Sequence, residues 1–152
     1  MNVAGYREAF HAAPSVEIDP GFVVRVVSLP GLAILKLFAW ADRGAADSKD
    51  AVDLAMLLRQ YGAAGNEDRL YGAEIAVMEA ASYDLDLAGA RLLGRDVARI
   101  SGAETQTRLL ALVDDRTEQL ARAMARDMGA VRDPVAAARA LIGQLATGLR
   151  EP

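Results

Sequence analysis

Cysteine is absent from this 152-residue sequence, and histidine occurs once, as His11. Without cysteine the chain cannot form a disulfide, a zinc–thiolate site or a cysteine nucleophile. A single histidine also argues against a metal site built from several histidines and against a serine–histidine–aspartate triad. Because His11 follows Phe10 in a short apolar segment, a surface or packing role is favoured for it over catalysis.

Lysine is nearly absent as well. Of seventeen lysines and arginines, only Lys36 and Lys49 are lysines, and the formal net charge is −4. This acidic balance argues against a dominant nucleic-acid-binding face, although arginines could still gather on one side. No apolar run is long enough to span a bilayer, and no signal peptide opens the chain. We therefore expect a cytoplasmic protein without a membrane partner, folded as a single domain over residues 1–152.

The hydrophobic pattern predicts a mainly α-helical protein with a short N-terminal β-hairpin, an α+β fold. Residues 15–28 hold two strand-like runs separated by the turn sequence Asp19-Pro20-Gly21. An isolated hairpin is marginal in water, so this one should pack on the helices or extend another sheet. Residues 29–61 predict a pair of helices, and residues 66–150 predict a helical region. About six helices should follow the hairpin.

Three helix starts can be placed within residues 66–150. Asp84 or Asp86 is suited to cap one helix, and Asp133 precedes a proline, which favours the first helical position. Ser101 and Glu104 have the spacing of a capping box, so a long helix is expected to begin at Ser101.

The second helix of the 29–61 pair has the most informative spacing. Its core face follows the i, i+3, i+4, i+7 rule and consists of Leu54, Leu57, Leu58 and Tyr61. One turn earlier, the same face carries Asp50 and Asp53 instead of apolar residues. Two carboxylates are therefore expected at the inward-facing start of this helix.

Lys36 lies within the first helix of the pair, in a run from Leu29 to Trp40 that is apolar almost all round. A buried charge needs a partner, so Lys36 is expected to meet Asp50 and Asp53 in a polar pocket. Lys49 is four residues before Asp53, close enough to pair with it on the helix surface. The alternative is that the acids serve only the helix dipole and that Lys36 extends to water.

One acidic pair does not predict a metal site. Asp84-Leu85-Asp86 has the D-x-D pattern that holds Mg²⁺ in many nucleotidyl-transfer enzymes. Here, however, the pair follows a predicted helix end and is succeeded by helix-starting leucines, so ordinary helix capping is the better interpretation. No metal ligands are assigned in this sequence.

Two segments, LPGLAILKLFAWADR (29–43) and KDAVDL (49–54), resemble the later motifs of bacterial predicted nucleotidyltransferases of the abortive-infection (AbiEii-like) toxin type. The resemblance continues through GNEDRLY (65–71) and AGARLLGRD (88–96), so it covers most of the first 100 residues. It implies a mixed sheet with helices that transfers a nucleotide from a nucleoside triphosphate (NTP) with Mg²⁺. By resemblance, Lys36, Lys49 and Arg43 would bind the nucleotide, and Asp50 or Asp53 would orient the attacking hydroxyl or act as a base.

The sequence departs from that family pattern in one respect. The Gly-Ser turn and the D-x-D strand that hold Mg²⁺ in the family should lie upstream of Met1. The expectation is therefore a C-terminal part of such an enzyme: a truncated product, a misassigned start, or a subunit beside a separately encoded N-terminal half. Alone it should be inactive, with neither Mg²⁺ nor NTP bound.

The competing interpretation is a non-catalytic helical module for protein–protein interaction, such as an antitoxin-like partner. In it, Lys36, Lys49, Asp50 and Asp53 form a structural ion-pair network, and the free edge of the hairpin pairs with another chain. Either interpretation leaves an apolar hairpin face exposed, which favours a homodimer. RNA stays open as a partner, with no feature of the sequence to support it.

Overall fold

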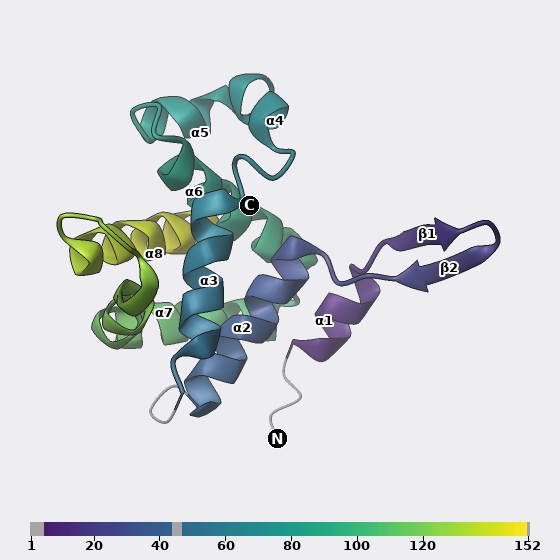
Figure 1. Ribbon diagram of the computed structural model, residues 1–152, viewed down its shortest axis with the longest axis horizontal. Coiled ribbons are helices and arrows are strands. Elements are labelled where there is room, and N and C mark those ends of the chain that lie inside the picture. Colours follow the sequence, from purple (N-terminus) through teal and green to yellow (C-terminus); the bar gives the residue numbers. More distant parts are fainter. Residues whose placement is uncertain (1–4, 44–46, 152) are drawn as a thin grey trace.

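A computed structural model describes residues 5–43 and 47–151 of the chain. The fold is mainly helical with one two-stranded hairpin near the N-terminus, as the hydrophobic pattern predicts (Figure 1). The elements are, in order, α1 (Tyr6–His11), β1 (Ser15–Asp19), β2 (Phe22–Arg25), α2 (Leu29–Arg43), α3 (Lys49–Gln60), α4 (Glu67–Tyr71), α5 (Ile75–Ala80), α6 (Leu85–Ile100), α7 (Ala103–Met124), the 3₁₀ turn η1 (Ala125–Asp127) and α8 (Pro134–Arg150).

The described residues form eight α-helices, so the expected number of about six was too low. One helix, α1, precedes the hairpin and seven follow it. The predicted helical region 66–150 begins with two short helices, α4 and α5, because the chain bends at Gly72, where φ is −118° and ψ is −105°. A glycine is the residue that most easily leaves the helical conformation.

The hairpin projects from the helical body instead of packing on it (Figure 1). Its strands pair antiparallel, with Val16 opposite Val24, and the turn is closed by Gly21 at a φ of 77°. Such a positive φ suits glycine because a Cβ would clash there. Ile18, Phe22 and Val23 are each more than half exposed. Of the two expected placements, packing on the helices was therefore wrong, and extension of another sheet stays a prediction.

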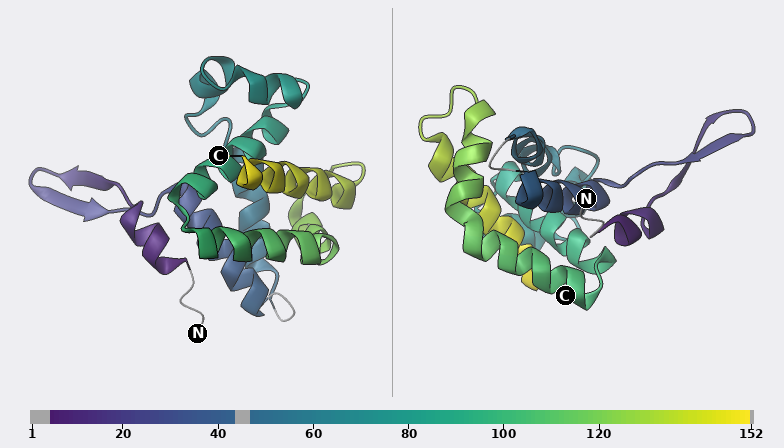
Figure 2. Two further views of the ribbon diagram at one scale, coloured as in Figure 1. Left: turned by 180° about the vertical axis from the view of Figure 1, so that it is seen from behind. Right: turned by 90° about the horizontal axis from the view of Figure 1, so that it is seen from below.

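The core lies between α2, α3, α6, α7 and α8. Seen from behind in Figure 2, α7 and α8, coloured green and yellow, lie over α2 and α3. The predicted core face of α3 is confirmed, since Leu54 and Leu58 are fully buried and Tyr61 is 5% exposed. Burial of apolar side chains on this scale is the main force that holds the helices together.

Helices α6 and α8 cross at very close range. A Cβ atom added at Gly94 of α6 would overlap the backbone carbonyl of Leu145, and one added at Gly148 of α8 would overlap that of Arg91. Glycine at both positions lets the two backbones approach each other directly. The alanines and leucines around this crossing are buried in the same core.

Two of the expected helix starts are confirmed and one is wrong. The side chain of Asp84 accepts a hydrogen bond from the Leu87 backbone, and that of Asp133 accepts one from Ala136. At α7, however, the N-cap is Gly102, which has no side chain to contribute, and the hydroxyl of Ser101 is buried without a hydrogen-bond partner. Ser101 is therefore the C-cap residue of α6 and does not form a capping box with Glu104.

No helix within residues 5–43 and 47–151 combines the length and apolar character needed to cross a membrane.

Candidate functional site

The candidate site lies between the antiparallel helices α2 and α3. Ser28 begins α2 by accepting a hydrogen bond from the Gly31 backbone, and every residue of the helix from Leu29 to Ala41 is buried or partly buried. Helix α3 begins at Lys49, where the carboxylate of Asp47 accepts a hydrogen bond from the Lys49 backbone. Because the first turn of α3 faces α2, its acids meet the one lysine on that helix.

Lys36 joins both predicted carboxylates. Its Nζ atom donates hydrogen bonds to Oδ1 of Asp50 at 3.1 Å and to Oδ2 of Asp53 at 2.5 Å. The Lys36 side chain is 21% exposed, Asp50 is 9% exposed and Asp53 is 37% exposed. The predicted contact of one ammonium with two acids of the next helix is thus confirmed. The alternative, in which the Lys36 side chain extends to water, was wrong.

Arg43 completes this group at the end of α2. Its guanidinium donates to Oδ2 of Asp50 at 2.7 Å, while its side chain is 65% exposed. Asp50 therefore accepts from two cations, one through each oxygen. We refer to Lys36, Arg43, Asp50 and Asp53 as the lysine cluster.

Lys49 lies outside the lysine cluster. Its side chain is exposed, and within residues 5–43 and 47–151 it forms no ion pair with Asp53. The expected surface pair was wrong because the Asp53 carboxylate turns toward Lys36, a half-buried cation on the neighbouring helix. Lys49 nonetheless stays near the cluster, at the first position of α3 and adjacent to Asp50 in sequence.

The electrostatics of the cluster favour charged side chains. Burial by itself would lower the pKa of Lys36, but the hydrogen bonds to Asp53 and Asp50 outweigh burial, and the pKa is raised. Burial would likewise raise the pKa of Asp50, yet the hydrogen bonds from Arg43 and Lys36 hold it below its usual value. Both groups are therefore ionised at neutral pH.

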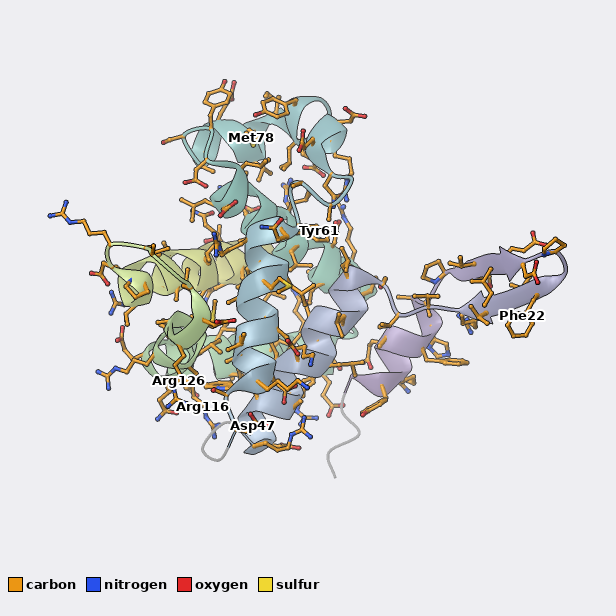
Figure 3. The ribbon with its side chains drawn as sticks, in the orientation of Figure 1. Phe22, Asp47, Tyr61, Met78, Arg116 and Arg126 are labelled. Carbon is orange, nitrogen blue, oxygen red and sulfur yellow. The ribbon has the colours of Figure 1, made fainter. Side chains whose placement is uncertain are left out.

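A second polar cluster, which the sequence did not predict, lies between α4 and α6. The buried carboxylate of Asp96 accepts a hydrogen bond from the Tyr61 hydroxyl at 2.6 Å and two from the Arg69 guanidinium, at 2.8 and 3.0 Å. Arg99 is a second cationic donor to Asp96, at 2.7 Å. Burial and the hydrogen bond to Asp96 raise the pKa of Tyr61 far above its ordinary value. Figure 3 shows Tyr61 at the end of α3, facing these elements.

The signal for this second cluster was present in two quoted segments. Arg69 lies in GNEDRLY and Asp96 in AGARLLGRD, the parts to which the resemblance assigned no role. An acidic residue on the otherwise apolar, buried face of a helix is the pattern that reveals such a group. We refer to Tyr61, Arg69, Asp96 and Arg99 as the aspartate cluster.

The described residues do not fit the Mg²⁺ ion that the resemblance implies. Within residues 5–43 and 47–151 no group of three or more His, Cys, Asp or Glu side chains could hold a metal ion. The oxygens of Asp50 are taken by two cations, and Asp84 caps a helix. Asp86 faces Arg59 instead of pairing with Asp84.

Comparison with known protein families gives a match over most of the chain. The profile of the family described as "Nucleotidyl transferase AbiEii toxin, Type IV TA system" matches residues 4–142. No curated protein and no solved structure matches the chain. The family match covers the lysine cluster, the aspartate cluster and nearly all of the sequence. The chain therefore belongs to the AbiEii nucleotidyl transferase toxin family.

Proposed function

We propose that the lysine cluster is the part of a nucleotidyl transferase that binds the nucleotide phosphates and orients the acceptor hydroxyl. The observation that best supports this proposal is the position of Lys36, a partly exposed ammonium held by two carboxylates between α2 and α3. Family membership supports a nucleotidyl-transfer chemistry of this kind.

Lys36 is the proposed phosphate-binding group. An ammonium has three N–H donors, and the carboxylates of Asp50 and Asp53 use two of them. The third donor is left for a phosphate oxygen, and the 21% exposure of the side chain gives that oxygen access. A compact point charge on a flexible stem suits a triphosphate. Arg43 and Lys49, both exposed, extend positive charge along the same edge.

Asp53 is proposed to orient the acceptor hydroxyl, and Asp50 to position the cations. Both oxygens of Asp50 already accept from Lys36 or Arg43, so neither is placed to receive a hydroxyl proton. Asp53 is more exposed, and only its Oδ2 has a partner among the residues that the structure describes. Its Oδ1 can therefore accept from a hydroxyl group, the task of a general base or an orienting carboxylate.

Complete transfer needs groups that the described residues lack. Phosphoryl-type transfer draws much of its stabilisation from metal-bound charge, and residues 5–43 and 47–151 present no cluster of three or more His, Cys, Asp or Glu side chains that could hold a metal. From the sequence we expected no NTP to bind to the chain alone; because Lys36 keeps one donor for a phosphate oxygen, we infer instead that the chain binds nucleotide without transferring it. The metal-holding acids would then come from elsewhere, as in a separately encoded half.

Nucleotide binding by Lys36 can be measured directly. Equilibrium dialysis with each of the four labelled NTPs should detect binding by the native chain, and Lys36→Met should weaken it at least about tenfold because a charge-assisted hydrogen bond is lost. Arg132→Gln, an exposed arginine outside the cluster, should bind as the native chain does. Equal binding by Lys36→Met and native protein, with both folded by circular dichroism, would refute the proposal.

The inactivity of the isolated chain is tested separately. The purified chain is incubated with Mg²⁺, labelled NTPs and total RNA, and labelled product is sought on a denaturing gel. We expect none above background. Robust turnover would overturn the inference that the metal-holding acids come from elsewhere, without affecting the assignment of Lys36.

A second candidate function is protein–protein interaction through the hairpin. Ile18, Phe22 and Val23 are 57–60% exposed on an element that projects from the body, and both strand edges are free in the two-stranded sheet of the described chain. Free edges recruit further strands. A type IV toxin–antitoxin family also implies a separate antitoxin, and the hairpin is the proposed docking element for it. The same hairpin is proposed to join two copies of this chain in a homodimer.

A further inference from the structure

A cavity of about 660 Å³ lies between the C-terminal half of α2 and the second half of α7, apart from the lysine cluster. Its polar lining consists of Trp40, Asp42, Arg116, Gln119, Arg122 and Arg126. Figure 3 shows Arg116 and Arg126 at the same end of the molecule, beside the end of α2. Three arginines against one aspartate make this lining electropositive in a protein whose net charge is −4.

The arginines of this cavity are available to a ligand. Arg122 and Arg126 are exposed and form no hydrogen bond or ion pair with any described residue. Glu118, whose pKa is lowered mainly by Arg139 and to a smaller extent by Arg122, accepts two hydrogen bonds from Arg139 and none from Arg122. Asp42, the acidic residue in the lining, is already engaged in another polar or electrostatic interaction.

Arg116 is held at the cavity by an interruption in α7. Its φ of −120° and ψ of 17° are not helical, and its guanidinium donates to the carbonyl of Ala41 at 3.1 Å. This bond anchors the side chain across the gap between the helices and uses one of five N–H donors. The remaining donors can serve a ligand in the cavity.

Trp40 supplies the observation that points to an acceptor. The residue is 4% exposed and lines the cavity, and its indole N–H is buried without any hydrogen-bond partner in the described structure. A buried N–H donor without an acceptor is costly, by about 1–3 kcal/mol for a typical polar group. A ligand with acceptor oxygens toward which the Trp40 side chain can turn would relieve this cost.

We propose that the cavity lined by Trp40, Arg116, Arg122 and Arg126 binds a phosphate group. Three guanidiniums and an indole N–H are all donors, and together they exceed what the two oxygens of a carboxylate can accept. A phosphate offers more oxygens and more charge, and guanidinium groups bind it in bidentate fashion. The phosphate is supplied either by a free phosphate compound or by a nucleic-acid backbone. This site does not depend on the function proposed for Lys36.

The chain carries its own probe for this binding, because Trp40 is the single tryptophan in the sequence. Trp40 emission is followed while native protein is titrated with sodium pyrophosphate and, separately, with a single-stranded oligonucleotide that lacks terminal phosphates. Both series are run at one low salt concentration, because phosphate binding weakens with salt. We expect a saturable change of emission with at least one probe.

Variants separate this cavity from general electrostatics and from the lysine cluster. Arg122→Gln/Arg126→Gln should raise the dissociation constant at least about tenfold. Arg7→Gln/Arg132→Gln removes two charges from exposed arginines outside the cavity and should change it less than about twofold. Lys36→Met, one helical turn before Trp40, should also leave it unchanged, so the failure of either site is recognised independently.

Each outcome decides the proposal. Saturation by pyrophosphate assigns the site to free phosphate compounds, and saturation by the oligonucleotide alone assigns it to a backbone phosphate. Absence of a saturable change with both probes would overturn the proposal. Equal affinity of native protein and Arg122→Gln/Arg126→Gln would overturn it too, as would an equal loss in the Arg7→Gln/Arg132→Gln control.

Discussion

At the scale of single residues, the Asp96 carboxylate connects three parts of the chain. It accepts hydrogen bonds from Tyr61 at the end of α3, from Arg69 on α4 and from Arg99 on its own helix. Burial alone would raise the pKa of Asp96, but the hydrogen bonds from Arg69 and Tyr61 outweigh burial and lower it. An acid in this position stabilises the fold only while it is ionised.

We expect Asp96→Asn to lower the free energy of unfolding at pH 7 by about 3 kcal/mol, because Arg69 and Tyr61 lose a buried charged acceptor. The folded-state pKa lies below the unfolded value of about 3.9. The contribution is therefore complete well above pH 4 and is lost as the pH falls through the folded-state pKa. Urea unfolding of the native protein and of Asp96→Asn between pH 7 and pH 3 should show that the difference between their free energies of unfolding becomes smaller as the pH falls.

The control for this prediction is Asp114→Asn. Asp114 also accepts from an arginine, Arg150, but both side chains are about half exposed. Removing such a pair should cost less than about 1 kcal/mol at any pH. A difference between native protein and Asp96→Asn that stays constant down to pH 3 would contradict an ionised Asp96.

The contact of Lys36 with Asp50 and Asp53 could be predicted from sequence, whereas the contact of Arg43 with Asp50 and the whole aspartate cluster could not. Asp50 and Asp53 continue a periodic helix face, and Lys36 lies on the adjacent helix, so short-range periodicity is sufficient. Two of the three partners of Asp96, Arg69 and Tyr61, lie 27 and 35 positions away on elements whose mutual placement depends on the whole fold. The catalytic and nucleotide-binding roles stay predictions at this scale.

At the scale of secondary-structure elements, the crossing of α6 and α8 is set by the absence of side chains. Gly94 and Gly148 each face the backbone of the other helix, with no space for a Cβ atom. By contrast, Gly143 of the same helix α8 is exposed and has nothing within 4 Å of a Cβ position. Two glycines of one helix thus have opposite packing environments.

We expect Gly148→Ala to lower the free energy of unfolding by about 2–3 kcal/mol, because the helices must separate to admit the methyl group. Gly143→Ala should raise it by about 0.5–1 kcal/mol, since alanine favours the helix and meets no neighbour. Thermal melts followed by circular dichroism compare the two. Equal effects of the same sign would contradict the close crossing.

Helix ends were predictable where a side chain acts locally and not where backbone geometry decides. Asp84 and Asp133 cap their helices as expected. The start of α7 shifted to Gly102 because the chain leaves α6 in an extended conformation at Ser101, with a ψ of 137°, so the Ser101 hydroxyl cannot reach the helix. The division between α4 and α5 depends on the conformation of Gly72, and the sequence around Gly72 is also compatible with one continuous helix.

At the scale of the whole molecule, a compact helical body carries one exposed appendage (Figure 1). Arg25 fixes the base of the hairpin by donating to the carbonyls of His11 and Ala13 and by lying 4.4 Å over the ring of Phe10. Beyond this base, the strands have only each other as partners in the described sheet. The hairpin therefore contributes little to the core.

We expect Phe22→Ser/Val23→Ser to leave the thermal midpoint unchanged within about 2 °C, because both side chains are more than half exposed. The same change should abolish concentration-dependent association in sedimentation velocity. Met56→Ser, which removes another exposed apolar side chain outside the hairpin, should leave association intact. A native chain that sediments as a monomer at every concentration would contradict the homodimer.

The projecting hairpin has a consequence for the handling of the protein. Glu17, Asp19 and Arg25 are the charges that interrupt its apolar strands, and they act as gatekeepers against stacking of strands into fibrils. Replacing Glu17 and Asp19 by their amides would leave Arg25 as the remaining charge on a pair of free strand edges. Such a variant should form thioflavin-positive aggregates on storage while its helical body is still folded.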